Sequence, residues 1–478
     1  MLSEAKVLCV DLDGTLLRSD TLYELLARML RRNPLYIFLL PFWILRGRAF
    51  LKRKLTSLFG KYIETLPYSD VVVSYINEAK SSGRKLYLAT ACDEILARKI
   101  ADKFGIFDDV FGSNSGLNLK SSEKAKFLVS KFGSGNFDYM GDSNSDFPVW
   151  DVCKCAIGVN LSPRLAKIFK KKYSNSKILY SSNQKSWLNG IFSFLREMRI
   201  HQWAKNILVF VPLVLSHNYL QINGILNSIA AFFAFSFCAS ATYIFNDILD
   251  IESDRRHRQK KNRPIASGEV SIPSAISLCI ILAMATLGIC VWLPIDFSLV
   301  LLSYVLATLS YSFYFKRKLL ADVMLLAILY TVRIYAGACA IGTEISFWLF
   351  AFSVFIFLSL AFLKRFVEVK DMSESEIVAG RAYIGSDAFI LGAMGVSAGF
   401  VSALTYMVYV DSAAGALYGS PRMLLFCVVP VVLFICRIWI RACRGQVHSD
   451  PIFSAVRDPY NYGLALIILF IFALAQPK

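Results

Sequence analysis

Residues 7–15 read VLCVDLDGT, an apolar run of four residues followed by two aspartates, a glycine and a threonine. The run indicates a buried strand that ends in a turn. Because alternate residues of a strand point the same way, Asp11 and Asp13 are expected near one point. Three further apolar runs, at 86–89, 138–140 and 155–158, are each followed by a turn and a helical pattern. This alternation predicts a parallel α/β domain over residues 1–195.

Polar residues follow the other predicted strands or open the next helix. They are Thr90, Lys124 and the pair Asp142 and Asp146. Ligands of such sheets bind beyond the carboxyl ends of the strands. There, one of the two first aspartates can attack phosphorus while the other handles a proton. A hydroxyl and an ammonium group can hold phosphate oxygens, and carboxylates suit Mg²⁺.

In this order, the four elements resemble the motifs of the haloacid dehalogenase superfamily, with a helical cap of the phosphoserine-phosphatase kind at about residues 20–80. The resemblance implies a phosphatase with Asp11 as nucleophile and Asp13 as acid and base. It further implies Thr90 and Lys124 as phosphate-binding residues. The expected Mg²⁺ ligands come from a set of four aspartates, namely Asp11, Asp13, Asp142 and Asp146.

The cap contains an apolar run, residues 35–45, that is too short to cross a bilayer. Arginines flank it at positions 31, 32, 46 and 48. Two interpretations stand equal: the run lies among lipid headgroups, or it forms the core of the cap.

The composition excludes a soluble two-domain protein, since 56% of the 478 residues are apolar and only 18% are charged. The formal charge of +17 is spread between apolar runs, which favours a bilayer partner over nucleic acid. Eleven cysteines form no CxxC pair and are expected to be reduced. The start of the chain leads directly into a strand, so we expect no cleavable signal peptide.

An all-α bundle of nine transmembrane helices is predicted over residues 196–478. The apolar stretches lie at about 203–221, 225–245, 274–293, 296–315, 319–341, 346–363, 386–410, 421–440 and 460–475. Basic residues gather in alternate connections. The positive-inside rule then predicts an inner-membrane protein with a cytoplasmic N-terminal domain and an external C-terminus.

An acidic stripe closes the second of these stretches, where Asn246, Asp247, Asp250 and Asp254 share about a quarter of a helix surface. Such groups repel one another unless a cation joins them, and at a membrane boundary they are usually functional. Mg²⁺ that bridges the stripe to a diphosphate would resolve the conflict. The alternative is a solvated helix end.

Cations follow the stripe closely and recur in later helices. Arg255, His257, Lys260 and Arg263 come directly after it. Alone they would form a positive-inside loop, but beside the stripe they indicate a phosphate clamp. Asp322 and Arg333 are expected to form a paired, inward-facing set, as are Lys364 and Glu368. One pocket open to the cytosol would explain all these groups.

This half resembles the UbiA-type polyprenyl transferases, most closely the branch of decaprenyl-phosphate phosphoribosyltransferases. The motifs that carry the narrower resemblance are HQWAKN at 201–206, NDxxDxxxDR at 246–255, RPIA at 263–266, Tyr311-Ser312 with Lys316, Asp322, Arg333 with Ala336-Gly337, and KRxxE at 364–368. It implies Mg²⁺-dependent transfer of 5-phosphoribose from phosphoribosyl diphosphate to a polyprenyl phosphate. Catalysis would rest on the acidic stripe, and the substrates would be held by Lys205, Arg255, His257, Lys260, Arg263, Lys316, Asp322, Arg333, Lys364 and Arg365.

A second aspartate-rich cluster is typical of UbiA-type enzymes, whereas here Asp322 stands alone among cations. A donor that carries an additional phosphate would favour a site with fewer acidic and more cationic side chains. The fused phosphatase could then remove the 5-phosphate from the lipid product, giving a pentose donor for an envelope polysaccharide. Two alternatives stay open. One is an isoprenyl transferase with an aromatic acceptor, and the other is a lipid-binding or transport protein with a regulatory phosphatase domain.

Overall fold

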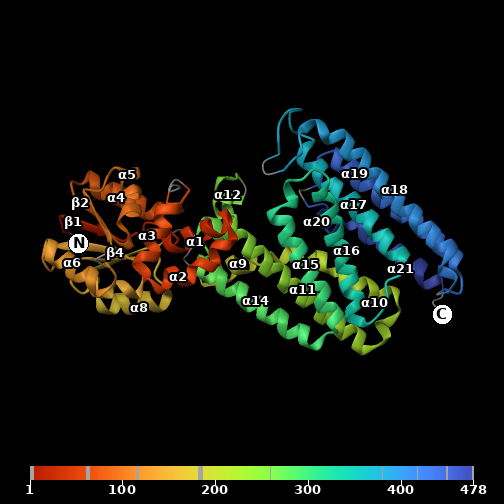
Figure 1. Ribbon diagram of the computed structural model, residues 1–478, viewed down its shortest axis with the longest axis horizontal. Helices are drawn as coiled ribbons and strands as arrows, with labels where there is room; N and C mark the ends of the chain where they lie inside the picture. Colours follow the sequence, from red (N-terminus) through yellow and green to blue (C-terminus); the bar gives the residue numbers. More distant parts are fainter. Residues whose placement is uncertain are drawn as a thin grey trace. The chain divides into compact units, whose positions relative to one another are not determined.

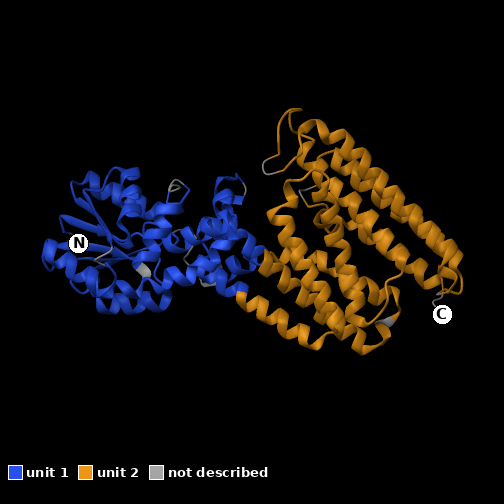
Figure 2. Cartoon of the chain, in the orientation of Figure 1, with its two compact units in different colours: residues 1–198, 243–279 blue, residues 199–242, 280–478 orange. Residues whose placement is uncertain are grey.

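The computed structural model describes residues 5–60, 65–114, 118–180, 187–258, 260–378, 381–416, 418–447 and 450–475. The chain forms two compact units (Figure 2). Unit 1 contains residues 1–198 together with 243–279, and unit 2 contains residues 199–242 and 280–478. Unit 1 therefore combines the α/β domain with the acidic stripe and the segment after it.

A parallel sheet of six strands forms the centre of the α/β domain, in the order β3-β2-β1-β4-β5-β6. The strands are β1 (Val7–Val10), β2 (Lys85–Asp93), β3 (Asp109–Ser113), β4 (Phe137–Gly141), β5 (Ala156–Val159) and β6 (Ser176–Leu179). The four predicted strands are confirmed. The edge strands β3 and β6 were not predicted, because their short mixed sequences carry no apolar run.

Alternation along the strands divides the core into two layers. Leu8 and Val10 pack with the helices α4 (Asp70–Ser81) and α5 (Glu94–Phe104), whereas Cys9 packs with α6 (Ser122–Phe132) and α8 (Pro163–Lys172). Figure 1 shows these two helix pairs on opposite faces of the sheet. Helices on both faces are what an all-parallel sheet requires, because its strands are apolar on both sides.

The cap consists of α1 (Thr21–Arg32), η1 (Pro34–Leu39), α2 (Leu40–Leu45) and α3 (Arg48–Phe59). It begins directly after the first acidic turn, where Asp20 caps α1 by accepting a hydrogen bond from the Leu22 amide. The predicted cap extended to about residue 80. Its last part is instead α4, which packs against the sheet as an ordinary crossover helix.

The apolar run in the cap does not form a buried core. Of its long side chains only Trp43 is buried, at 9% exposed, while Phe38 is 70% exposed and Leu45 is 85% exposed. The interpretation of the run as the core of the cap is therefore wrong for most of its residues.

Within the described residues, seven helical segments are long and apolar enough to cross a membrane. They are α11 (Ile222–Leu249), α14 (Ile272–Trp292), α15 (Ile295–Phe313), α16 (Ala321–Ile341), α17 (Phe347–Val369), Gly385–Ser412, which contains α18 (Ala388–Ser412), and Pro421–Cys443, which contains α19 (Val428–Cys443). The chain is thus a multi-pass membrane protein with a helical bundle.

The predicted count of nine crossings is not confirmed. The first predicted stretch forms a 3-10 helix, η3 (Ile200–Phe210), and a five-residue helix, α10 (Val211–Leu215), which together are too short. The last forms α20 (Pro451–Arg457) and α21 (Pro459–Leu474), which are bent by 79° and add one span if counted as a pair. Pro459 causes this break, since it disfavours helical geometry in the residue before it. By length and composition, the described helices therefore include seven or eight candidate crossings.

Candidate functional site

Three carboxylates meet at the carboxyl ends of neighbouring strands in unit 1. Asp11 follows β1, and Asp142 and Asp146 follow β4, which pairs with β1. Within the described residues these three form the one group of three or more potential metal-ligand side chains in which one oxygen of each lies within 4.8 Å of the others. Oxygen ligands at such spacing suit a hard divalent cation such as Mg²⁺.

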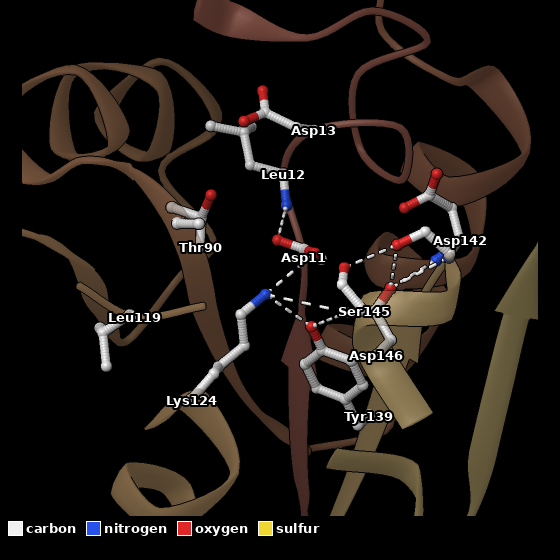
Figure 3. Close-up of polar contacts among 12 residues, drawn as sticks. Asp11, Leu12, Asp13, Thr90, Leu119, Lys124, Tyr139, Asp142, Ser145 and Asp146 are labelled. Carbon is white, nitrogen blue, oxygen red and sulfur yellow. Dashed lines mark hydrogen bonds and ion pairs between the residues drawn. The ribbon is translucent and has the colours of Figure 1, made fainter. Parts of the chain in front are cut away.

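Both carboxylate oxygens of Asp11 are held in place (Figure 3). Its Oδ1 accepts a hydrogen bond of 2.8 Å from the Leu12 amide, and its Oδ2 lies 2.9 Å from Nζ of Lys124. The same ammonium group donates to the hydroxyl of Tyr139 at 2.8 Å and lies 3.9 Å from Asp146. Lys124 is buried, so it balances the acidic cluster in a region of low dielectric.

Burial and mutual repulsion disfavour the charged forms of these acids. Burial raises the pKa of Asp142 to about 8, and the charges of Asp146 and Asp11 add to the shift. Burial likewise raises the pKa of Asp11 to about 6, although the Lys124 ammonium group opposes this. A divalent cation between the three carboxylates would lower both pKa values, because it stabilises the ionised forms. The residues present therefore fit a metal ion.

Asp13 faces away from this cluster, toward the start of α1 (Figure 3). Its two oxygens accept hydrogen bonds from the amide and the hydroxyl of Thr21, at 2.8 and 3.2 Å. Burial and the charge of Asp20 raise the pKa of Asp13 to about 7. The raised pKa suits a role in proton transfer, which stays a prediction, whereas the hydrogen bonds to Thr21 do not support the prediction of Asp13 as a metal ligand. Such a carboxyl group can both hold and release a proton near neutral pH.

Thr90 lies in β2, buried at the same end of the sheet, where its hydroxyl accepts a hydrogen bond from the Cys92 amide at 3.0 Å.

The close approach of the loop after β1 to Asp142 requires glycine at position 14. Gly14 has a φ of +77°, and a Cβ atom built there would lie 2.2 Å from Oδ2 of Asp142. The loop can thus approach the carboxylate of Asp142 only with glycine at this position.

A cavity of about 980 Å³ opens from these residues. Asp11, Asp13, Thr90, Lys124 and Asp142 line its inner end. Other parts of its wall come from α2 and α3 of the cap and from residues 268–274 at the start of α14. The volume greatly exceeds that of a phosphate group, so the cavity has room for a large phosphate ester.

The acidic stripe is arranged differently. Asp250 lies between α11 and the short helix α12 (Ile251–Arg256), and the chain remains nearly helical there. Asp247 and Asp254 are buried and both accept hydrogen bonds from Nη1 of Arg263, at 2.8 and 2.5 Å. The cation between two of the predicted metal ligands is thus a guanidinium group of the chain itself. The proposed Mg²⁺ site on the stripe stays a prediction.

Helix α1 of the cap binds the segment that carries this stripe, within unit 1. The guanidinium group of Arg255 donates two hydrogen bonds to Glu24, at 3.0 and 2.7 Å, and both side chains are almost fully buried. Arg31 lies 3.0 Å from Asp250. Arg255, predicted to bind phosphate, is therefore held in the described structure by a carboxylate of the cap.

The other two predicted members of the phosphate clamp are exposed. His257 and Lys260 lie on the surface after α12, where the Lys260 amide donates to the imidazole Nδ1 at 3.4 Å. Asn246 is half-buried in the last turn of α11.

In unit 2, Asp322 pairs with a different arginine from the one predicted. Its carboxylate accepts a hydrogen bond of 2.6 Å from Nε of Arg365 and one of 2.5 Å from the hydroxyl of Tyr383. Arg333, the expected partner, lies eleven residues along α16, about 16 Å away at 1.5 Å per residue. Sharing a helix face therefore did not bring the two charges into contact.

Arg333 and Lys205 instead have partners from other helices. Nε of Arg333 donates to the side chain of Asn206 at 3.0 Å, and Lys205 forms an ion pair with Asp450. The expected pair of Lys364 and Glu368 is replaced by a contact of 2.5 Å between Glu368 and Arg365. A further predicted residue, Lys316, lies in η6 (Phe315–Arg317), where its carbonyl accepts a hydrogen bond of 3.4 Å from Arg381.

Gly337 marks a close approach between helices of this unit. A Cβ atom there would lie 2.1 Å from the carbonyl oxygen of Val209, so α16 and η3 can approach only with glycine at this position. The same helices, with α17, α18 and α21, line an apolar cavity of about 620 Å³.

Several of the residues that build these sites were not identified from the sequence. Tyr139 lies inside a predicted strand, Glu24 resembles an ordinary first-turn acid, and Asp450 lies in a connection far along the chain from Lys205. Only the three-dimensional structure brings them to their partners.

Comparison with known proteins assigns a family to the membrane half of the chain. Residues 209–454, more than half of the chain, match the model of the UbiA prenyltransferase family. The uncharacterised protein y4nM of Sinorhizobium fredii is 34% identical over 474 residues, which cover 98% of this chain and 91% of that protein. Both halves are thus present together in a relative.

Two further similarities each cover a smaller share of the chain. Decaprenyl-phosphate phosphoribosyltransferase of Mycolicibacterium smegmatis is 32% identical over 188 residues, 38% of this chain and 58% of that enzyme. A solved HAD family hydrolase of Salmonella enterica is 15% identical, with a TM-score of 0.29 over 37% of this chain and 68% of that chain. By the match of its membrane half, the chain belongs to the UbiA prenyltransferase family.

Proposed function

We propose that the chain is a bifunctional membrane enzyme that transfers 5-phosphoribose to a polyprenyl phosphate and then removes the 5-phosphate. The observation that carries the phosphatase half is the position of Asp11, held between Lys124 and the carboxylates of Asp142 and Asp146. A carboxylate fixed beside a buried cation is arranged to attack a phosphate ester.

In the phosphatase reaction, an oxygen of Asp11 attacks phosphorus and the ester oxygen leaves. Asp13 donates its proton to that oxygen, since its pKa of about 7 keeps a proton available near neutrality. Asp13 then takes a proton from the water that hydrolyses the phospho-aspartate, which restores Asp11 and releases phosphate. Lys124 and the Thr90 hydroxyl hold the phosphoryl oxygens through both steps. Mg²⁺ held by Asp11, Asp142 and Asp146 would neutralise phosphoryl charge.

For the transferase, the support is the similarity to the phosphoribosyltransferase of Mycolicibacterium and the cationic surroundings of Asp322. Asp247, Asp250 and Asp254 would bind Mg²⁺ with the departing diphosphate, while Lys205, Arg333 or both hold the acceptor phosphate. Displacement of Arg263 from Asp247 and Asp254 is then part of substrate binding. The apolar cavity of unit 2 would suit part of the polyprenyl chain.

The proposed location is the inner membrane, with the phosphatase domain in the cytoplasm and the C-terminus outside. Basic residues in alternate connections support the first two assignments. An external C-terminus requires an odd number of crossings. The product, a polyprenyl-phosphoryl ribose, would donate pentose to an envelope polysaccharide.

Purified protein in vesicles with polyprenyl phosphate and ¹⁴C-ribose-labelled phosphoribosyl diphosphate tests the transferase. We expect a labelled lipid that requires Mg²⁺ and is lost in Asp254→Asn. An isoprenyl transferase would form no labelled lipid here, but would transfer an isoprenyl diphosphate to an aromatic acceptor. A transport or scaffold protein would show neither reaction.

A further inference from the structure

The apolar run in the cap, residues 35–45, presents an unusual surface for a domain in water. Leu35 and Phe42 are each 66% exposed, and Phe38 and Leu45 are more exposed still. Ile37, Leu39 and Ile44 add to the same surface. So many long apolar side chains within eleven residues form a patch that marks an interaction surface.

Positive charge borders this patch. Arg32 and Arg46 are exposed at its two ends. Among the eleven residues of the patch there is no acidic or basic side chain. An apolar face with basic ends is complementary to the headgroup region of an anionic bilayer, where cations meet lipid phosphates and apolar side chains enter the acyl boundary.

Both ends of the patch are related to candidate membrane-spanning helices within unit 1, one by an ion pair and the other by a shared cavity. Before the patch, Arg31 lies 3.0 Å from Asp250, which directly follows the membrane helix α11. Near its other end, Ile44 lines the same cavity as Ser271 and Ser274, at the start of the membrane helix α14. The segment that leads into the patch is therefore tied to the end of one candidate membrane helix, and the patch shares a cavity wall with the start of another.

We infer that residues 35–45 lie in the headgroup region of the bilayer and hold the phosphatase cavity at the membrane surface. The substrate that enters this cavity is then a phosphate monoester linked to a lipid, and that lipid lies in the same bilayer that the patch contacts. This substrate class rests on the proposed phosphatase function of Asp11, whereas the contact with lipid does not.

A photoreactive residue tests the contact directly. The full chain is reconstituted in vesicles of phosphatidylcholine and phosphatidylglycerol that contain a radiolabelled phospholipid, with Phe38→p-benzoylphenylalanine. The matched control is Ile168→p-benzoylphenylalanine, because Ile168 is 54% exposed in α8 of the same domain. We expect labelled lipid on the Phe38 variant at least about fivefold above the control. Equal labelling of the two, or cross-linking of Phe38 to a protein in native membranes instead of lipid, contradicts the inference.

The double substitution Phe38→Asp with Phe42→Asp tests the consequence for the substrate. Both side chains are exposed, so the fold should tolerate the change. We expect KM for a lipid-borne phosphate monoester in vesicles to rise about tenfold, with hydrolysis of soluble p-nitrophenyl phosphate unchanged. Equal loss on both substrates, or no loss on either, overturns the role in substrate access. If the unsubstituted protein hydrolyses neither substrate, the proposed phosphatase function fails while cross-linking still decides the contact with lipid.

Discussion

Two acidic clusters in one chain have different structures. In the α/β domain, β1 and β4 lie side by side and bring Asp11, Asp142 and Asp146 within 4.8 Å of one another. On the membrane side, Arg263 lies between the acids Asp247 and Asp254 at a helix end, and Arg31 lies beside Asp250. Convergent strand ends thus gather carboxylates that could hold a metal ion, whereas in the helical stripe arginines neutralise the carboxylates.

The largest effect is expected from a substitution in the acidic cluster of the α/β domain. Asp11→Asn should reduce phosphate release by at least about a thousandfold, because the nucleophile itself is lost. Formation of labelled lipid from phosphoribosyl diphosphate should continue in this variant. Phosphate release from p-nitrophenyl phosphate is the measurement, and a residual rate within tenfold of the unsubstituted protein would show that Asp11 is not the nucleophile.

A second variant concerns the contact between the cap and the stripe. Glu24→Gln removes the charge that balances the buried guanidinium group of Arg255. Breaking a buried ion pair from one side costs about 3 kcal/mol, so the unfolding midpoint of the purified full chain should fall. The control is Glu123→Gln, which removes an exposed ion pair with Lys126. Equal midpoints for the two variants would mean that the buried pair does not stabilise unit 1.

Arg263→Gln tests whether the acidic stripe binds a divalent cation. Without the guanidinium group, the carboxylates of Asp247 and Asp254 repel each other, and we expect a loss of about 2 kcal/mol, discounted because Arg263 is partly exposed. If the stripe binds a divalent cation, Mg²⁺ should restore more stability to this variant than it adds to the unsubstituted protein. Thermal unfolding with and without Mg²⁺ measures this, and an equal response of both proteins would argue against a metal site there.

The smallest effect is expected for an exposed counterpart of these ion pairs. Arg98 lies 2.9 Å from Glu94 on the surface of α5. Arg98→Ala should change the free energy of unfolding by less than about 0.5 kcal/mol, since solvent and side-chain entropy offset such pairs. A larger loss on thermal unfolding would show that exposed and buried ion pairs are not as different here as their burial indicates.

The sequence predicted the parts of the molecule that local patterns determine. Apolar runs identified β1, β2, β4 and β5, and the residues after them contain the acidic cluster. Composition likewise identified the membrane half. The edge strands β3 and β6 and the 3-10 helix η3 were missed or misjudged, because short mixed segments take their structure from neighbours.

The sequence predicted which charged residues lie in the sites better than it predicted which side chains they contact. Asp322 was paired with Arg333 from the shared helix face, but Arg365 of the next helix is its partner. Helical periodicity gives the direction of a side chain, and it does not give the distance to residues on another helix. The contact of Glu24 with Arg255, which joins positions 231 apart in the chain, has no local signal at all.

The most direct test of the two-step account uses phosphoribosyl diphosphate labelled with ¹⁴C in ribose and with ³²P in the 5-phosphate. Incubated with polyprenyl phosphate and Mg²⁺, the unsubstituted protein should give a lipid that keeps ¹⁴C and has lost ³²P, whereas Asp11→Asn should give a lipid that carries both labels. The same ratio of labels in the lipid from both proteins, or no labelled lipid from either, would contradict the account.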